Sequence, residues 1–359
     1  MPKFRTLPIF LTSSFLALVY MSPAWAGSLE KESAISTSIL LYTESATVLK
    51  GGLAHATRYN NVIEGSLKAD TGIAGLWPEG TAKISIYHIS SGRPSMNLIG
   101  DAQGASNLDA PPETRVYEAW YRQGFESGKA HLKAGIVDLN QIFDVTDDAA
   151  LFLNASFGIT PTISLNTSAS IYPLPGAGVV ADAKINGFTG LAGIFQAHPQ
   201  NRQNFIHNGT MRIIEIDHDG IKAGAWQQSG AVTSSDSGLY GIVDKTLYQS
   251  HNGASLAGFV QFGASRSSIN QIPYYTGGGL VLTSFISSRQ NDAAGIGFAN
   301  AAFRGPGSAA ETAIEATYSA VISKWLTLQP DLQLILHPGG QKATPRALVF
   351  LLRAQWTLF

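Results

Sequence analysis

The stretch of residues 129–137 reads KAHLKAGIV, and its side chains alternate between polar and apolar with a period of two. His131 and Lys133 share the polar face, while the alanine, leucine and isoleucine side chains share the other face. A period of two is that of a β-strand, and a strand with one charged and one apolar face separates water from an apolar medium. The stretch 81–87, TAKISIY, repeats the pattern. Both stretches predict a sheet with one wet face and one apolar face.

The rest of the chain carries the same signal, interrupted by residues that favour turns. Tight turns are predicted at 77–80 and 126–128, and long connections rich in Gly, Pro, Asn and Asp at 91–114 and 139–161. This arrangement is typical of an all-β, membrane-spanning antiparallel β-barrel with long extracellular loops and short periplasmic turns. We place sixteen strands near 34–50, 61–75, 81–90, 115–125, 129–138, 177–186, 189–196, 209–218, 221–229, 237–248, 254–263, 274–285, 293–303, 310–322, 326–336 and 346–359.

The N-terminus has the pattern of a secretory signal peptide. Lys3 and Arg5 precede an apolar stretch at 7–20, and small residues follow it. We therefore expect a cleaved signal peptide over 1–26 and a single exported barrel domain over 27–359. A retained membrane anchor is the alternative, but the apolar stretch is short for a helix that spans a membrane.

The composition excludes several classes of function. Charged residues make up 14% of the chain, against roughly 25% in an average soluble domain, and the formal net charge of −1 does not suit a nucleic-acid partner. The chain has no cysteine, so disulfides and thiol chemistry are excluded. The eight histidines show no zinc spacing, and the glycine triplet 277–279 lies within a predicted strand. We expect no catalytic residue, no metal and no cofactor.

The last predicted strand ends the chain on an aromatic residue, Phe359. A terminal Phe on an amphipathic strand resembles the signal read by the barrel-assembly machinery of the outer membrane, which is therefore an expected partner. The match is imperfect, because Phe359 falls on the polar face with Arg353, opposite Phe350 and Trp356. The alternative is an ordinary closing strand that ends in Phe by chance.

Four stretches of the chain together match the pattern of one family. They are LIGDAQG at 98–104 with APP at 110–112, RVYEAW at 115–120, FDVTD at 143–147 with LFLNASFGI at 151–159, and WLTLQPDLQ at 325–333 with HPGG at 337–340. These stretches resemble the carbohydrate-selective porins of the OprB family, and the QPDLQ string is the most specific part. His337 departs from the pattern, because the family usually has Asn there.

The resemblance implies a barrel in the outer membrane of a Gram-negative bacterium, with a narrow water-filled pore and passive diffusion of small sugars. It implies small carbohydrates and outer-membrane lipid as partners. It leaves open which sugar is preferred, how wide the pore is, and whether several barrels associate as a homo-oligomer.

A sugar presents hydroxyls and an apolar ring face, so a selective pore needs hydrogen-bonding side chains beside an aromatic surface. On one predicted strand, Glu118, Trp120 and Arg122 share a face with Val116, and we assign that face to the lumen. Tyr117 falls on the opposite face, toward the lipid. The alternatives are that Glu118 and Arg122 only brace the wall as ion pairs, and that Trp120 belongs to the periplasmic aromatic girdle.

Neighbouring strands supply further lumen candidates of the same kinds. His131 and Lys133 face the same side as Glu118, and we expect a contact between Glu118 and Lys133 across the strand pair. The remaining pore-lining candidates are Lys83, Tyr87, Lys222 and Trp226. For each of these, plain solvated lining of the lumen is the alternative role.

The long predicted loop 139–161 is expected to fold inward and narrow the pore. Asp138, Asp144, Asp147 and Asp148 form an acidic set at its start, and carboxylate oxygens are the ligands that a divalent cation such as Ca²⁺ prefers. The spacing matches no calcium-loop pattern, so we expect helix caps and turn hydrogen bonds and assign no metal site.

Three other interpretations remain open. A general diffusion porin has the same architecture without a preference for sugars. An adhesin or receptor barrel would use its long loops to bind a partner at the cell surface. An outer-membrane enzyme would need a Ser/His or Asp/His set on adjacent strands, and neither His88 nor His131 has such an evident partner.

Overall fold

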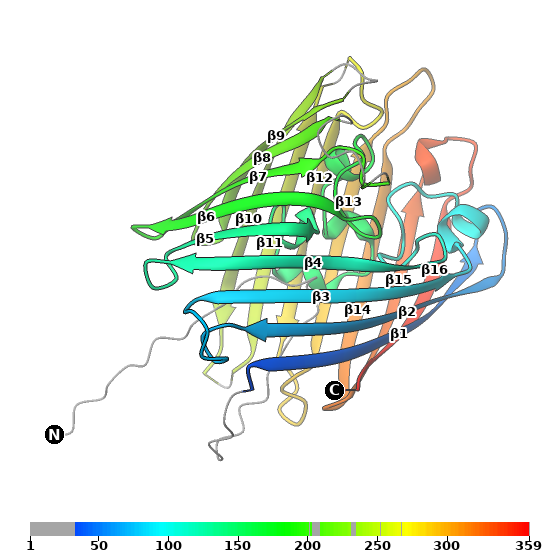
Figure 1. Ribbon diagram of the computed structural model, residues 1–359. Coiled ribbons are helices and arrows are strands. Elements are labelled where there is room, and N and C mark those ends of the chain that lie inside the picture. Colours follow the sequence, from blue (N-terminus) through cyan, green and yellow to red (C-terminus); the bar gives the residue numbers. More distant parts are fainter. Residues whose placement is uncertain are drawn as a thin grey trace.

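The computed structural model describes residues 33–200, 202, 209–230, 235–251, 253–266 and 268–358. Over these residues, sixteen antiparallel strands pair in sequence order, and β1 pairs with β16 to close the barrel (Figure 1). The expected signal peptide over 1–26 and the terminal Phe359 lie outside the described residues. No helix in the described part of the chain is long and apolar enough to cross a membrane.

The bounds of the elements follow the predicted strands closely. The strands are β1 (Ile35–Lys50), β2 (Thr57–Asp70), β3 (Gly80–Ser91), β4 (Glu113–Phe125), β5 (Ala130–Val137), β6 (Gly176–Ile185), β7 (Phe188–Gln196), β8 (Thr210–His218), β9 (Ile221–Ser229), β10 (Asp236–Gln249), β11 (Ser255–Ser265), β12 (Tyr274–Thr283), β13 (Ala293–Ala302), β14 (Glu311–Ser323), β15 (Leu326–Leu336) and β16 (Ala347–Thr357). The short helices are η1 (Ser95–Ile99), η2 (Leu139–Gln141), η3 (Asp148–Leu151), η4 (Ala155–Phe157), α1 (Pro161–Ser164) and η5 (Pro338–Gly340). The prediction of a sixteen-stranded antiparallel barrel is confirmed.

The second strand is displaced from its predicted place. It begins at Thr57 rather than at 61, and it ends at Asp70 rather than at 75. A carboxylate oxygen of Asp70 accepts a hydrogen bond from the Ile73 N–H at 2.9 Å, and the Leu76 N–H donates to the Thr71 carbonyl at 2.9 Å. These bonds turn the chain away from the strand pair, which ends the strand early.

Each strand divides its side chains between two environments, as the alternation predicts. On β16, Leu352 is 43% exposed on the outer face, whereas Leu351 and Arg353 beside it are buried on the inner face. Ile84 and Ile86 on β3 are likewise exposed. The outer face of the barrel is therefore apolar, and the polar side chains face inward.

One inward residue was predicted on the wrong face. In the pairing of β3 with β4, Ser85 opposes Glu118 and Ile86 opposes Val116, so Tyr117 is an extra residue in a β-bulge. Tyr117 is therefore buried inside the barrel rather than facing the lipid, and Val116 lies opposite the outward Ile86. A one-residue bulge reverses the alternation on one side of it, which a period-two pattern does not anticipate.

Two long connections enter the barrel from the rim opposite to the start of β1 and the end of β16, which we call the loop rim (Figure 1). They are loop 92–112, which carries η1, and loop 138–175, which carries η2, η3, η4 and α1. The second loop contains the predicted inward loop 139–161 and extends beyond it. The sequence predicted that loop 92–112 is long but not that it folds inward.

Loop 138–175 is seated against the inner wall by its aromatic side chains. Phe152 and Phe157 are buried in one cluster with Phe259 of β11. The wall makes room with glycine, because a Cβ atom at Gly295 on β13 would lie 2.9 Å from Cζ of Phe152. Ring burial and close backbone approach therefore fix the loop on β11–β13.

Candidate functional site

A cavity of about 680 Å³ lies between the two inward loops and the barrel wall. Arg93 and Ser95 line it near the loop rim. Thr327 and Gln355 line it near the opposite rim, where β1 begins and β16 ends and which we call the terminal rim. Its lining therefore reaches from one end of the barrel toward the other.

Three tyrosines form an aromatic group beside this cavity. Tyr87 of β3 and the bulged Tyr117 of β4 stack with ring centroids 4.0 Å apart, and Tyr172 of loop 138–175 lies 6.2 Å and 6.1 Å from them. The Tyr172 hydroxyl donates to the Leu108 carbonyl at 3.1 Å. Tyr87 and Tyr172 line the cavity, so the lumen presents aromatic rings with polar tips.

The charged side chains of β2–β5 continue from Tyr87 toward the terminal rim. We call this set the charged wall: Glu64, Lys83, Glu118, Trp120, Arg122, His131 and Lys133. The Tyr87 hydroxyl donates to Glu64 at 3.0 Å, and Nζ of Lys83 lies 3.9 Å from Glu64 and 2.9 Å from Glu118. Charges of opposite sign on neighbouring strands thus pair along the wall.

The expected contact between Glu118 and Lys133 is wrong. The register of β4 and β5 opposes Lys133 to Arg122, and Glu118 is bound instead by Lys83. Nζ of Lys133 lies 4.3 Å from the ring centroid of Trp120, which is a cation–π distance. Gly135 makes room for this tryptophan, because a Cβ atom there would lie 2.6 Å from Cα of Trp120. Trp120 and Lys133 therefore form one amphipathic surface.

His131 has a charged partner that the sequence did not indicate. Its Nδ1 lies 2.7 Å from a carboxylate oxygen of Asp182 on β6, and the register of β5 and β6 opposes the two residues directly. Both lie near the terminal rim. The pair therefore extends the charged wall from β5 to β6.

Lys222 and Trp226 face inward on β9, but loop 138–175 covers them. Nζ of Lys222 donates to the Val145 carbonyl of the loop at 2.6 Å. Trp226 is 3% exposed and belongs to a cluster with Phe143 and Ile163 of the same loop. These two residues contact the loop, whereas Trp120 on the charged wall is only half-buried.

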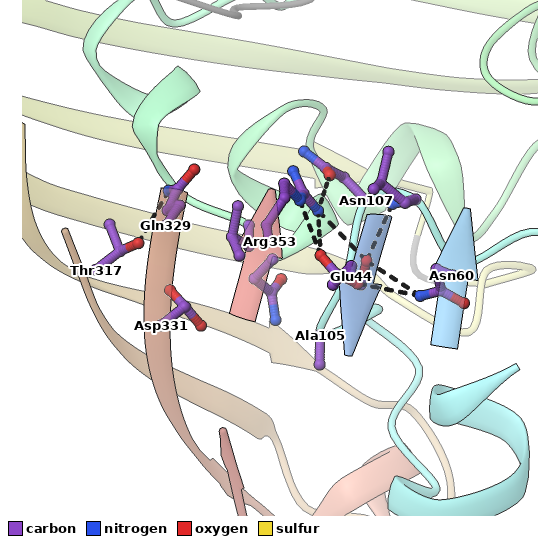
Figure 2. A network of polar contacts seen from close by, with 12 residues as sticks. Glu44, Asn60, Ala105, Asn107, Thr317, Gln329, Asp331 and Arg353 are labelled. Atoms are coloured by element: carbon purple, nitrogen blue, oxygen red, sulfur yellow. Dashed lines mark hydrogen bonds and ion pairs between the residues drawn. The ribbon is translucent and has the colours of Figure 1, made fainter. Parts of the chain in front are cut away.

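An ion pair across the barrel closure was missed at the sequence level. Arg353 of β16 donates from Nη2 to Glu44 of β1 at 2.6 Å and to Oδ1 of Asn107 at 2.8 Å, and Asn60 donates to Glu44 at 3.1 Å (Figure 2). Arg353 lines the cavity. Its place on the polar face of the last strand was the only sequence signal, because 309 residues separate it from Glu44.

Two members of the acidic set at the start of loop 138–175, Asp138 and Asp144, accept hydrogen bonds within the protein. Asp138 accepts from the Asn140 N–H at 2.8 Å, as a cap of η2, and also from the Tyr117 hydroxyl. Asp144 accepts from the Thr160 N–H at 2.8 Å, and burial raises its pKa to about 7. Among the residues that the structure describes, no group of three such side chains is arranged to hold a metal ion.

Comparison with known proteins agrees with this architecture. The family model for "Carbohydrate-selective porin, OprB family" matches residues 54–234 and 217–358. A comparison with curated proteins gives no match.

Solved structures from Pseudomonas putida and Rh. blastica have a similar fold. The high-pH structure of Pseudomonas putida OprB has a TM-score of 0.80 at 19% identity, over 90% of this chain and 94% of that chain. The low-pH structure of the same protein has a TM-score of 0.62 at 17% identity, over 97% and 100%. A variant of Rh. blastica porin has a TM-score of 0.56 at 11% identity, over 90% and 100%. At these identities the likeness concerns the fold.

Proposed function

The chain belongs to the carbohydrate-selective porin family, OprB, and on that premise we propose that it lets small sugars diffuse passively through the barrel lumen. The family and the closed barrel support a porin role in the outer membrane of a Gram-negative bacterium, and a channel rather than an enzyme. The preference for sugars is the part that needs a direct measurement.

One observation carries the proposal. The cavity is lined from near the loop rim to near the terminal rim, and its lining combines tyrosine rings with amide and charged side chains. A sugar offers an apolar ring face and several hydroxyls, so both kinds of lining are used at once. A solute of the same size without hydroxyls would satisfy fewer of these groups.

The charged wall supplies the second part of the proposed path. Trp120 offers a ring face, and Lys133, Arg122 and Lys83 offer donors beside it. Glu118 and His131 hold neighbouring cations or acids in place, and Tyr87 joins the wall to the cavity. We assign Lys222 and Trp226 to holding loop 138–175, because the loop covers both.

The test is liposome swelling with the purified, refolded protein. Monosaccharides, disaccharides and trisaccharides are compared with an amino acid and a salt of similar size. Faster uptake of the sugars supports the proposal. Uptake ranked by size alone means a general diffusion porin, and no uptake reopens both the adhesin or receptor interpretation and the enzyme interpretation.

A pair of tryptophan variants locates the selectivity. Trp120→Leu removes the ring on the charged wall and should reduce the preference for sugars over amino acids. Trp325→Leu removes a tryptophan that is 50% exposed on the turn between β14 and β15, and it should leave the preference unchanged. Equal effects of the two variants would remove Trp120 from the proposed path.

Export and assembly belong to the same proposal. We expect cleavage before Gly27, which the mass of the mature protein checks, and recognition of the last strand by the barrel-assembly machinery. Deleting Phe359 should lower the amount of folded barrel in the outer membrane without changing the properties of the barrels that do assemble. Association into a homo-oligomer remains to be measured by light scattering in detergent.

A further inference from the structure

Two glutamates of β14 have partners that their position would not suggest. Glu311 and Glu315 point inward, are fully buried, and lie four residues apart on one strand. Their carboxyl oxygens accept from backbone N–H groups of the inward loops, while Glu311 also accepts from η5 and Glu315 also shares a side-chain hydrogen bond with Asp331 of β15. They therefore do not face the cavity as free charges.

Glu311 holds loop 92–112. Its two oxygens accept from the N–H groups of Ala102 at 2.9 Å and Gln103 at 2.8 Å, and it also accepts from the Gly339 N–H of η5. Consecutive backbone N–H groups form a concave site for oxygen acceptors, and a buried N–H group that loses its acceptor destabilises the folded state.

Glu315 holds loop 138–175 in the same way. Its oxygens accept from the N–H groups of Leu153 at 2.6 Å and Asn154 at 3.1 Å. Gln333, directly opposite on β15, extends the contact to both loops. It donates to the Ala105 carbonyl at 2.7 Å and accepts from the Asn154 side chain at 3.2 Å.

The two loops are also bonded to each other at this place. The Asn107 N–H donates to the Leu153 carbonyl and the Ala155 N–H donates to the Gly104 carbonyl, both at 2.8 Å. Residues 101–107 and 153–155 therefore form one unit on the wall. The same unit lines the cavity with Gly104, Asn107 and Leu153.

We propose that Glu311 and Glu315 are positioning residues that act together as a clasp, holding both loops as one unit and so setting the width of the passage. The unit lies between the wall and the cavity, so its release widens the cavity. Glutamine cannot replace either residue, because its amide offers one acceptor where two N–H groups point and turns a donor toward the other. The effect on passage rests on the proposed function, whereas the effect on the loops does not.

The experiment uses the absence of cysteine from the chain. Ala105→Cys and Ser156→Cys each place a single thiol at a buried position in one of the two loops, and Ala169→Cys places one at the far end of loop 138–175, also buried. The rate of maleimide labelling is measured in each, alone and with Glu311→Gln or Glu315→Gln. Glu113→Gln is the matched control, because Glu113 pairs with Arg115 and lies outside the clasp.

Either clasp substitution should raise labelling in both Ala105→Cys and Ser156→Cys about tenfold or more, as expected when buried N–H groups lose a hydrogen-bond acceptor. Labelling in Ala169→Cys, and in all three cysteine variants combined with Glu113→Gln, should not change. If the labelling rate rises only in the loop that the substituted glutamate binds, the two loops are not held as one unit and the proposal is overturned. A rise in Ala169→Cys as well would mean general destabilisation, and no rise would mean that the carboxylates do not hold the loops.

A loop-side variant covers the case in which a glutamine variant does not assemble. Leu153→Pro removes the backbone N–H that donates a hydrogen bond to Glu315, and it leaves the residues of the barrel wall unchanged. Leu153→Ala keeps this N–H and controls for the loss of the leucine side chain. Only the proline variant should raise labelling at position 105 as well as at position 156. Equal labelling in the proline and alanine variants would overturn the clasp.

Swelling assays on the same variants test the link to passage. Release of the clasp should speed trisaccharides more than monosaccharides. If labelling rises but the ratio of trisaccharide to monosaccharide uptake does not change, the unit does not set the width of the passage. If the unmodified protein passes no sugar, the proposed function fails, while the labelling results still decide the role of the clasp in holding the loops.

Discussion

The inner face of the barrel has two contrasting regions, both rich in glutamate. On the charged wall, Glu64 and Glu118 are paired with Lys83 of a neighbouring strand. On the inner face of β8–β16, which we call the covered wall, Glu311 and Glu315 are paired with backbone N–H groups of loops. The same residue type on the same face of a strand therefore does two different things.

The difference arises from where the loops lie. The loops pack against part of β8–β16, where Glu311 and Glu315 accept hydrogen bonds from the loop backbone and Trp226 is buried beneath the loop. The charged wall keeps lysine, arginine and tryptophan side chains half-buried, and the proposed function has these side chains contact the solute. Under the proposed function, the glutamates of the covered wall hold the loops and the charges of the charged wall contact the solute, and substitutions should separate these two roles.

The largest effect is expected from breaking the ion pair at the barrel closure. Arg353→Met leaves Glu44 buried without its cation, since the two side chains are 7% and 0% exposed. We expect the free energy of unfolding to fall by about 3 kcal/mol in urea titrations of the refolded barrel. Arg122→Met on the charged wall should change it far less.

The double variant Glu44→Gln/Arg353→Met is the internal control for this pair. It removes the unpaired charge and should recover most of the lost stability. If the single and double variants are equally unstable, the arginine contributes by packing rather than by charge.

A smaller loss is expected from filling the glycine seat on the covered wall. In Gly295→Val, the added side chain would meet Phe152 and Leu151, where a Cβ atom already lies 2.9 Å and 3.0 Å away. We expect a loss of about 1–3 kcal/mol in the same titration, with noisier single-channel currents as the loop shifts. Ala294→Val, on the outer face of the same strand, should change neither the free energy of unfolding nor the current noise.

On the charged wall, we expect a change of selectivity with little loss of stability. Lys133→Met removes a cation whose contact with Trp120 is worth about 0.5–1 kcal/mol. The reversal potential in a salt gradient should shift toward cation preference. Lys222→Met, on the covered wall, removes a cation that is bonded to loop 138–175 and should shift the potential less. Equal shifts would contradict the division into two walls.

The smallest effect is expected from pH. Asp144 lies in loop 138–175, and burial first, then Glu215, raises its pKa to about 7, against the lowering effects of Thr160 and Lys222. Its pKa in an unfolded chain is about 3.9, so the docked loop favours the protonated form. The protonated Asp144 therefore stabilises the packing of loop 138–175 against the wall. This stabilisation is complete below about pH 4 and is lost as the pH rises through about 7.

Single-channel recordings between about pH 5 and about pH 8 check this sign, because they span the pKa of the buried carboxyl. Current noise should grow with pH in the unmodified protein. It should grow less in Asp144→Asn, which stays neutral throughout. An unchanged pH profile in the variant would remove Asp144 as the cause.

The strands and their two faces could be predicted because the evidence for them is local. Alternation in 81–87 and 129–137 needs only neighbouring residues, and both became strands with the expected faces. Phe350 and Leu352 lie outside and Arg353 inside, as the last strand predicts. Tyr117 was predicted on the wrong face because a bulge depends on the pairing of two strands. This pairing cannot be inferred from the sequence of either strand alone.

The division of the inner face was decided only by the tertiary structure. Trp120 and Trp226 have the same sequence signal, a tryptophan on the polar face of an amphipathic strand, yet the loop covers Trp226 and leaves Trp120 half-buried. Glu44 and Arg353 meet only because the barrel closes. By itself the sequence determined the barrel, since side-chain alternation is a property of each strand. The partners of the inward charges depend on loops that return from distant points of the chain, and no local pattern contains that information.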